Sequence, residues 1–235
     1  MSSILRPRFI AFALLAVFAT SACGDSEATQ RKAFTDFLQT RILDKPGLHV
    51  PKPTEEETKS FGNYAKDYAI IVSFNEAMDK TITGRMQQVV QSGMIRSLDE
   101  LTTRRGDIAA AIEGLTALRS ALDEQLAKAD AARAALTQPA ELRTIYDKAY
   151  ERTVTMPAKA FKDIFPAADN AFQAAQALAG FLDQHRDAIK INGSLVQTSD
   201  SKLGAELNRL ISALNANGQA IMDAQRKLQA LIQGS

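Results

Sequence analysis

The sequence predicts an all-α protein: an elongated antiparallel helical bundle with two long coiled-coil-like helices and one small β-hairpin before the last helix. The main observation is the spacing of apolar residues, which recur every three or four positions along most of the chain and so form one face of a helix. Composition is the second observation, because 11 alanines fall among the 29 residues from Ile108 to Leu136 and alanine is the strongest helix former. We therefore expect five or six helices.

The first helix is predicted over residues 31–43, where apolar side chains at helical spacing are Phe34, Phe37, Leu38 and Ile42. Three prolines and a glycine between residues 46 and 53 then predict a short extended loop. The next helix begins at Thr54, because Thr54 and Glu57 form a capping box. It continues to about residue 91 along an apolar stripe made of Phe61, Tyr64, Tyr68, Ile71, Met78, Ile82, Met86 and Val89.

The longest helix is predicted to begin at a second capping box, Ser97 to Glu100, and to end near residue 136. Its apolar positions repeat every seven residues, at Leu101, Ile108, Leu115, Leu122, Ala129 and Leu136. At 1.5 Å per residue such a helix is about 58 Å long. We expect it to pack antiparallel against the helix over residues 54–91, across a tight turn near residues 92–97.

Two helices are predicted between residues 139 and 165. Pro139 fits the first turn of a short helix, and Thr155 to Pro157 begins another. Pro166 is expected to break or kink that second helix, because its ring clashes with the preceding turn. An apolar stripe from Phe165 onward then predicts a helix to about residue 187.

A hairpin and a long final helix complete the predicted fold. Residues 189–197 place β-forming side chains on both sides of Asn192-Gly193, the pair favoured in type I′ turns. Capping candidates for the last helix are Thr198, Ser199 and Ser201, and its heptad positions are Leu207, Leu214, Ile221 and Leu228. Asn217 is a polar residue on that seam and a candidate for fixing its register. Because no composition boundary divides residues 31–232, we expect a single helical domain there.

Composition and charge exclude several functions. The 235 residues carry a formal charge of +1, which gives no general attraction to nucleic acid or acidic lipid. The single cysteine excludes an intramolecular disulfide and a zinc site built on cysteines, and two histidines leave little room for a histidine-rich metal centre. With 46% hydrophobic residues the chain is too apolar to be disordered.

The N-terminal 22 residues have the layout of a secretory signal peptide. Arg6 and Arg8 precede an apolar run of ten residues, 10–19, and small residues follow before Cys23. The run is too short to span a bilayer, which needs about 20 residues. Removing residues 1–22 leaves 26 basic against 27 acidic side chains, because only Arg6 and Arg8 are lost. Charge therefore offers the mature chain no means of holding a membrane.

Cys23 is the only residue for which the sequence predicts a functional role. The small residues Ser21 and Ala22 before it resemble the lipobox of bacterial lipoproteins, although Thr20 stands where leucine is commonest. That resemblance implies cleavage after Ala22 and acylation of Cys23, with residues 23–30 as a lipidated polar tether. In such lipoproteins an aspartate directly after the cysteine causes retention in the inner membrane. Here Gly24 takes that position and Asp25 comes one later, so the resemblance also implies an outer-membrane, periplasm-facing location. The alternative is ordinary signal-peptidase cleavage that leaves a free thiol.

Motifs that could support catalysis each have a simpler structural explanation. Ser199 and Lys202 match Ser-x-x-Lys, but its partner motifs are missing and a helix cap explains the residues. His49 and His185 lie 136 positions apart, with His49 in the proline loop and His185 near a helix end. The tripeptide Arg105-Gly106-Asp107 is attributed to chance, and the glycosylation sequon at Asn192 is explained by the predicted turn. The acidic run Glu55 to Glu57 is attributed to helix capping. We therefore predict no catalytic, cofactor-binding or metal-ligating residue.

One stripe leaves a binding function open. Tyr64, Tyr68, Met78 and Met86 could line a ligand groove, although aromatic and methionine side chains at helical spacing usually belong to a core. Polar residues on predicted seams, Asn75 and Asn217, are the places where a cavity would be expected.

Three stretches resemble the YiaF-like family of bacterial putative lipoproteins. They are Gln30 to Gln39, the run Phe61-Gly62-x-Tyr64-x-x-Asp67-Tyr68-Ala69-Ile70, and the Asn192-Gly193 turn ahead of a C-terminal helix. The resemblance covers nearly the whole mature chain. It implies a Gram-negative envelope lipoprotein built around a domain of unknown function. The only residue to which the resemblance assigns a role is Cys23, as the lipid-attachment position.

The sequence thus favours a non-catalytic envelope lipoprotein. We expect a membrane partner through the lipid anchor on Cys23, an envelope protein partner, no nucleic acid and no cofactor. The alternative is a protein that holds a lipid or another small apolar molecule between its helices. An enzyme is the least favoured class, because it would require Ser199 and Lys202, or His185 with carboxylates, to converge in a cleft.

Overall fold

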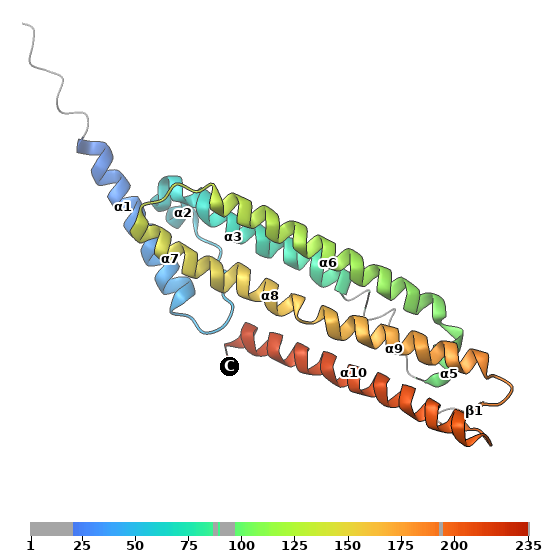
Figure 1. The fold of residues 1–235 in the computed structure, drawn as a ribbon. Helices are drawn as coiled ribbons and strands as arrows, with labels where there is room; N and C mark the ends of the chain where they lie inside the picture. The colour runs from blue at the N-terminus through green and yellow to red at the C-terminus, as the bar shows by residue number, and fades with distance from the viewer. Residues whose placement is uncertain (1–20, 87–88, 90–96, 193–194, 235) are drawn as a thin grey trace, which may run out of the picture.

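The computed structural model describes residues 21–86, 89, 97–192 and 195–234, and it confirms an elongated all-α bundle with one antiparallel hairpin (Figure 1). The elements, in chain order, are α1 (Ser21–Leu38), α2 (Glu55–Phe61), α3 (Ala65–Ala77), α5 (Leu98–Thr103), α6 (Arg105–Ala134), α7 (Ala140–Tyr150), α8 (Met156–Lys162), α9 (Phe165–Gln184), β1 (Lys190–Asn192), β2 (Leu195–Gln197) and α10 (Ser201–Gln233). A 3-10 turn, Gly62–Tyr64, and three π-helical turns, Gln39–Leu43, Met78–Thr83 and Glu151–Thr155, join or extend these helices.

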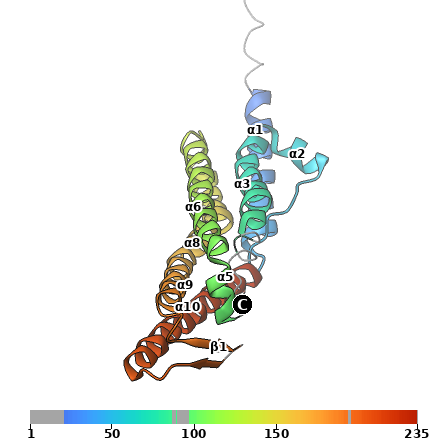
Figure 2. The ribbon, with the colours of Figure 1, turned by 90° about the vertical axis from the view of Figure 1, so that its right-hand side faces the viewer.

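Three layers of helices make up the bundle. α3 and α6 lie antiparallel along one side, α7, α8 and α9 follow one another through the middle, and α10 returns along α9 and α8 on the other side (Figure 1). α1 crosses α2 and α7 at one end, and the β-hairpin lies at the opposite end. Turned by 90°, the molecule shows α2 on the outer side of α1 and α3, away from α6 (Figure 2).

Two groups of buried side chains form the core. The larger one joins aromatic residues of α1, α2, α3 and α7 to leucines of α6, and the smaller one lies where α5, α9, the hairpin and α10 meet. Phe172 of α9 packs against both groups. The buried aromatic side chains of the larger group are Phe34, Phe37, Phe61, Tyr64, Tyr68, Phe74, Tyr146, Tyr150 and Phe165.

The first helix begins earlier than the sequence predicts. α1 starts at Ser21, so residues 23–30, predicted as a tether ahead of the helix, continue it without a break. None of these residues is proline, and the single Gly24 costs only about 1 kcal/mol in a helix. The helix ends as predicted near residue 43, in the π-helical turn.

The helix predicted over residues 54–91 is broken at Gly62. The capping box at its start is confirmed, since Thr54 Oγ1 accepts the Glu57 amide at 3.1 Å and Glu57 Oε2 accepts the Thr54 amide at 2.8 Å. Gly62 then takes φ +54° and ψ −123°, a conformation that a side chain opposes, and α3 restarts after it. The turn predicted at 92–97 falls mostly outside the described residues.

The longest predicted helix is also broken, at Arg104. Ser97 caps α5 as expected, with the Glu100 amide donating to Ser97 Oγ at 3.2 Å. Arg104 leaves the helical conformation (φ −107°, ψ 31°), and its side chain bridges Glu100 at 3.5 Å and Asp107 at 2.6 Å. The break allows α5 to pack against α9, and the 30 residues of α6 span about 45 Å rather than 58 Å.

The C-terminal half follows the prediction with small differences. The chain turns at Asp163 and Ile164, and Pro166 lies in the first turn of α9 as expected. Between residues 140 and 162, however, α7 runs through a π-helical turn into α8. In this turn the Met156 amide donates to the Glu151 carbonyl, so the backbone stays hydrogen-bonded up to Pro157. β1 pairs antiparallel with β2, Ile191 facing Val196, whereas the turn residues 193–194 lie outside the described residues.

Candidate functional site

Cys23 lies in the first turn of α1, the helix that crosses the end of the bundle. The fold holds this helix close to its start, because the Tyr64 hydroxyl donates to the Glu27 carboxylate and Arg31 lies 3.7 Å from the same carboxylate. Burial and this hydrogen bond raise the pKa of Tyr64 to about 12, so the phenol stays protonated and keeps donating. The N-terminal part of α1 is therefore attached through Glu27 to the 3-10 turn that precedes α3.

Gln30 adds a second contact one turn further along α1. A Cβ atom on Gly62 would lie 2.0 Å from Gln30 Oε1, so the glycine leaves the space that this side chain occupies. Phe34, the next residue on the same face, is fully buried. The contacts on this face explain why the helix approaches α2 so closely.

The residues considered for catalysis do not come together. His49 is exposed in the loop after α1, whereas His185 ends α9 with its ring 4.7 Å from Phe181. Ser199 is exposed, and Asp200, rather than Thr198, Ser199 or Ser201, caps α10 by accepting the amides of Lys202 at 2.8 Å and Leu203 at 3.2 Å. Both amides reach one carboxylate oxygen, so the Asp200 side chain satisfies two of the free backbone donors at the helix start. Ser-x-x-Lys is thus part of a helix start.

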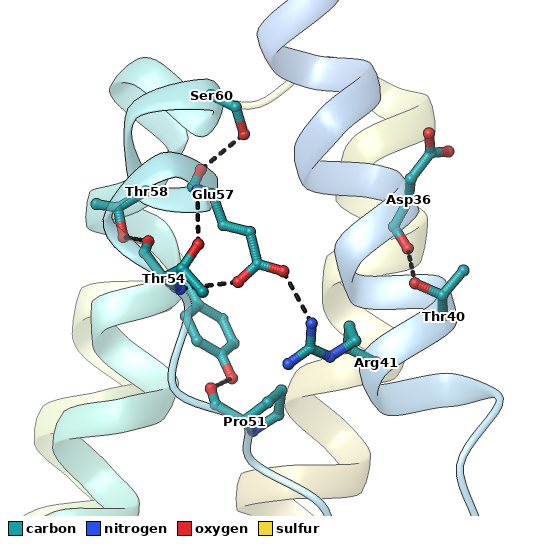
Figure 3. Close-up of polar contacts among 9 residues, drawn as sticks. Asp36, Thr40, Arg41, Pro51, Thr54, Glu57, Thr58 and Ser60 are labelled. Atoms are coloured by element: carbon teal, nitrogen blue, oxygen red, sulfur yellow. Dashed lines mark hydrogen bonds and ion pairs between the residues drawn. The ribbon is translucent and has the colours of Figure 1, made fainter.

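Other charged motifs also have structural roles. Arg105 donates to the Ala179 carbonyl at 2.5 Å and pairs with Asp183 at 3.2 Å, so it joins α6 to α9. Glu57 lies between Thr54 and Arg41, with its carboxylate 2.8 Å from the Arg41 guanidinium (Figure 3). Among the described residues no group of three metal-ligating side chains occurs.

The aromatic stripe belongs to the core. Tyr64 and Tyr68 are buried, with ring centroids 5.9 Å and 6.4 Å from Phe34, and Met78 and Met86 pack against the same group. Tyr68 also donates its hydroxyl to the Pro51 carbonyl at 2.6 Å, which fixes the proline loop against α3.

The seam asparagines join neighbouring helices. Asn75 donates to the Thr153 carbonyl at 3.1 Å, inside the π-helical turn Glu151–Thr155, and so satisfies a backbone group that the turn displaces. Asn217 lies 3.4 Å from the Asn170 carbonyl of α9, a weaker contact at a partly exposed position.

A buried carboxylate lies inside the larger core. Asp67 of α3 is 8% exposed, accepts a hydrogen bond from the Gln138 amide, and its carbonyl accepts the Tyr146 hydroxyl at 2.8 Å. Gln138 Oε1 is buried without a hydrogen-bond partner among the described residues. Burial raises the pKa of Asp67 above the usual range of aspartate, although the Gln138 bond and the charge of Arg143 oppose the shift.

Replacing Asp67 with Asn is expected to stabilise the protein at pH 7. Because the pKa of Asp67 is raised in the fold, the stability that its proton contributes is present below the unfolded pKa of about 3.9 and is lost as pH rises through the folded pKa. The amide of asparagine avoids the buried charge at any pH. Urea unfolding should show Asp67→Asn more stable than wild type at pH 7 and the two similar at pH 4; lower stability of the variant at pH 7 would contradict this account.

Arg152 ties together two segments that lie more than 100 positions apart in the sequence. It lies in the π-helical turn between α7 and α8, and its guanidinium donates to the carbonyls of Leu43 at 2.8 Å, Gly47 at 3.1 Å and Lys45. These carbonyls belong to the end of the first helix and the loop after it. We call this arrangement, with the contacts of the same loop to the end of α10, the Arg152 junction.

The end of α10 meets the loop backbone to backbone. The Leu48 amide donates to the Ile232 carbonyl at 3.0 Å, and Gly47 and Gly234 both have positive φ, +70° and +72°. A Cβ on Gly47 would lie 2.3 Å from the Ile232 carbonyl oxygen, so only glycine permits this approach. The C-terminus is thereby fixed to the first loop.

An open hollow of about 320 Å³ lies beside the Arg152 junction. Its walls come from the first loop, α7, α8, the π-helical turn and the end of α10, and they are formed by Leu43, Gly47, Leu48, Lys148, Glu151, Arg152, Met156, Leu231 and Gly234. Lys148, Glu151 and Arg152 are the charged groups in its wall. Apolar walls beside a lysine suit a small molecule that has an apolar part and an anionic group.

Removing Arg152 is expected to destabilise the fold by about 2–3 kcal/mol, because hydrogen bonds from a charged donor contribute roughly 1.5–3 kcal/mol and the site is partly exposed. Arg152→Lys should recover less than half of this loss, because an ammonium cannot reproduce the planar fork that reaches three carbonyls. Arg186→Ala, which removes an exposed i,i+3 ion pair with Asp183, is the control and should change stability by less than about 0.5 kcal/mol. Equal urea midpoints for Arg152→Ala and Arg186→Ala would contradict the role of the junction.

Sequence reasoning missed Arg152, Asp67 and Gln138. Arg152 has no motif around it, and its acceptors are backbone carbonyls more than 100 positions away. Asp67 did have a signal: it stands at a core position between Tyr64 and Tyr68.

Within the described part of the chain, no helix is both long and apolar enough to cross a membrane.

Comparison with known proteins places the chain in a family. Residues 11–229 match a family described as "Protein of unknown function (DUF3053)". The chain belongs to this family. It is 32% identical over 213 residues to "Uncharacterized protein YiaF" of Escherichia coli K12, and equally to the protein of that name in Shigella flexneri, with 90% of each chain covered. This confirms the resemblance to the YiaF-like family, and no solved structure matches the chain significantly.

Proposed function

We propose that this member of the DUF3053 family is a lipid-anchored protein of the bacterial envelope, whose helical bundle is a non-catalytic scaffold or protein-interaction module facing the periplasm. The observation that carries the proposal is the position of Cys23, the only cysteine of the chain, directly after Ser21-Ala22 and an apolar run of ten residues. Acylation by two or three chains holds a protein on a membrane for practical purposes permanently. We place the anchor in the outer membrane.

The interaction role is supported by the surface of α10. Its N-terminal half is buried at Leu207 and Leu210, whereas Met222 is 55% exposed and Ile232 is 44% exposed. The heptad residues Leu214, Ile221 and Leu228 between them are only half-buried. A helix with an apolar face that its own domain covers incompletely suits a protein partner.

Photo-crosslinking in intact cells tests the interaction role. A photoreactive amino acid at Met222 should give discrete adducts with one or a few envelope proteins, and the same residue at Lys128, an exposed position on α6, is the matched control. Adducts at Met222 that are absent at Lys128 support the proposal. Equal labelling at both positions, or none, would remove its main support.

The hollow at the Arg152 junction favours a second function, the binding of a lipid or another small apolar molecule with an anionic group. Leu43, Leu48 and Met156 would contact the apolar part and Lys148 the anion. Native mass spectrometry of protein purified without its anchor should then show an added mass that Met156→Glu removes. A clean apo mass for the wild-type protein under gentle conditions would argue against this function.

A further inference from the structure

We infer that the α2 end of the bundle lies directly against the lipid headgroups, while the β-hairpin end points away from the membrane. By the α2 end we mean α2, the N-terminal turns of α1 and the connection between α6 and α7, which share one end of the molecule (Figure 1). The inference rests on the proposed acylation of Cys23. It specifies which surface of the protein meets lipid and which end is available to partners at a distance.

The first argument is the length of chain between anchor and fold. Cys23 is already within α1, and Glu27, which contacts Tyr64 of the bundle, comes four residues later. At 1.5 Å per helical residue, about 6 Å separates the anchoring residue from the first of these contacts. A flexible tether of eight residues would have allowed the domain to move well away from the membrane, whereas this helix does not.

The second argument is that one face of α1 makes two contacts with the 3-10 turn Gly62–Tyr64 close to the start of the helix. The Glu27 carboxylate accepts the Tyr64 hydroxyl and lies 3.7 Å from Arg31, while the Gln30 amide occupies the space over Gly62. From Phe34 onward the helix is part of the buried core. The start of α1 cannot swing away from α2 and α3 without breaking these contacts.

The third argument is the chemistry of the α2 end. Its exposed residues include Lys59 and Ser60 of α2, Thr137 of the connection and Glu141 of α7. In Figure 3, Ser60 lies toward the N-terminal end of α1 and Thr54 lies further from it. This surface is polar with both signs of charge, which is compatible with hydrated headgroups but supplies no electrostatic binding of its own. The acyl chains must then provide the attachment.

The β-hairpin end is then expected to lie far from the membrane. α6 is 30 residues long and α10 is 33, so the bundle carries the hairpin and the start of α10 on the order of 45–50 Å from the α2 end. The chain carries a formal charge of only +1, so no overall charge draws the long sides of the bundle onto a lipid surface. We therefore expect the long axis to rise from the membrane.

Spin labels test the orientation in bilayers whose headgroups chelate Ni²⁺. A spin-labelled amino acid is placed at Lys59, near the α2 end, or at Lys190 of β1, and the processed protein is reconstituted into these bilayers. Relaxation enhancement by Ni²⁺ should be several-fold larger at Lys59 than at Lys190. Equal enhancement at both sites would mean that the bundle lies flat, and no enhancement at Lys59 would mean that the fold is held off the surface; either result overturns the inference.

A flexible insertion tests the rigid connection. Six Gly-Ser residues inserted after Asp25 add about 13 Å of flexible reach and should reduce the enhancement at Lys59. The same six residues added after Ser235 are the control and should leave it unchanged. If the insertion after Asp25 has no effect, α1 does not hold the domain at the membrane.

The intact mass of the reconstituted protein separates a failure of this inference from a failure of the proposed function. If the mass shows no acyl groups, the proposed natural anchor is wrong. The orientation is then tested on the same chain with a maleimide phospholipid coupled to Cys23, the only thiol in the sequence. The Lys59 and Lys190 comparison has the same expected result and the same contradicting results in that form.

Discussion

Cys23→Ser is expected to abolish processing of the precursor by the lipoprotein pathway and to remove all acyl label from the protein. In the proposed processing the thiol sulfur of Cys23 accepts the first lipid, and a serine hydroxyl is a much weaker nucleophile at neutral pH. The precursor should keep residues 1–22 and accumulate at its full length. Metabolic labelling with an alkyne fatty acid, followed by gel analysis of membrane and soluble fractions, measures both effects.

Ser26→Ala is the matched control for this change. Ser26 lies in the same helix three residues further along and is exposed, so its loss should alter neither processing nor labelling. If Cys23→Ser gave the same mature mass and the same membrane retention as wild type, the assignment of Cys23 as the anchor would be wrong.

Phe34→Ala is expected to cost about 3–5 kcal/mol of unfolding free energy, the usual range for a buried Phe→Ala change. Phe34 is fully buried, and its ring centroid lies 5.3 Å from that of Phe61 and 6.4 Å from that of Tyr146. It joins α1 to α2, α3 and α7, so the cavity left by alanine has rigid walls on several sides. Since each 1 kcal/mol shifts the melting temperature of a chain of this size by about 2–4 °C, the melting temperature should fall by about 6–20 °C.

Met222→Ala is the control for this substitution. Met222 is 55% exposed, and a surface change away from special features usually stays within about 0.5 kcal/mol. Calorimetry or urea unfolding of both variants measures the difference. A Phe34→Ala loss of less than about 1 kcal/mol would show that the aromatic group is not the centre of the fold.

Periodicity predicted most of the helical segments and many of their buried faces, but it missed the helical residues 23–30. The heptad residues Leu101, Ile108, Leu115 and Leu122 are all buried, because a helix that keeps one apolar face must pack that face against another element. The hairpin and the capping box at Thr54 also follow from local chemistry. These features depend on residues close in sequence.

The breaks in the helices could not be predicted in the same way. Arg104 interrupts a helix that local propensity favours, and α5 then packs against α9, about 75 positions away along the chain. The three π-helical turns have no distinct sequence pattern, and the turn at Glu151–Thr155 is supported by Asn75 from another helix. Gly62 did carry a signal, but a glycine inside a helical pattern is often tolerated.

The candidate sites also differ in whether they depend on residues close in the sequence or on residues far apart. Cys23 could be proposed from the sequence as the lipid-attachment site because the signals for processing a precursor lie in one short segment of the chain. The Arg152 junction could not, since it joins residues 43–48, residue 152 and residues 232–234 through backbone carbonyls that any sequence provides. The residues that the junction requires by type are Arg152, whose guanidinium reaches three carbonyls, and the two facing glycines, Gly47 and Gly234.

The two ends of the bundle therefore have different expected roles. The α2 end holds α1 through Glu27 and Gln30 and presents polar residues of both charges. The partly exposed face of α10 runs along the opposite side of the bundle from α3 and α6 (Figure 1). With the proposed anchor at the α2 end, this side of α10 is suited to bind the proposed protein partner at some distance from the membrane.

The intact mass of the protein extracted from membranes of the producing bacterium tests the central claim most directly. The account predicts a chain that begins at Cys23 and carries the added mass of a diacylglyceryl group and an N-acyl chain, and a fragment spectrum that locates both on Cys23. An unmodified chain, whether cleaved elsewhere or still carrying residues 1–22, would contradict it.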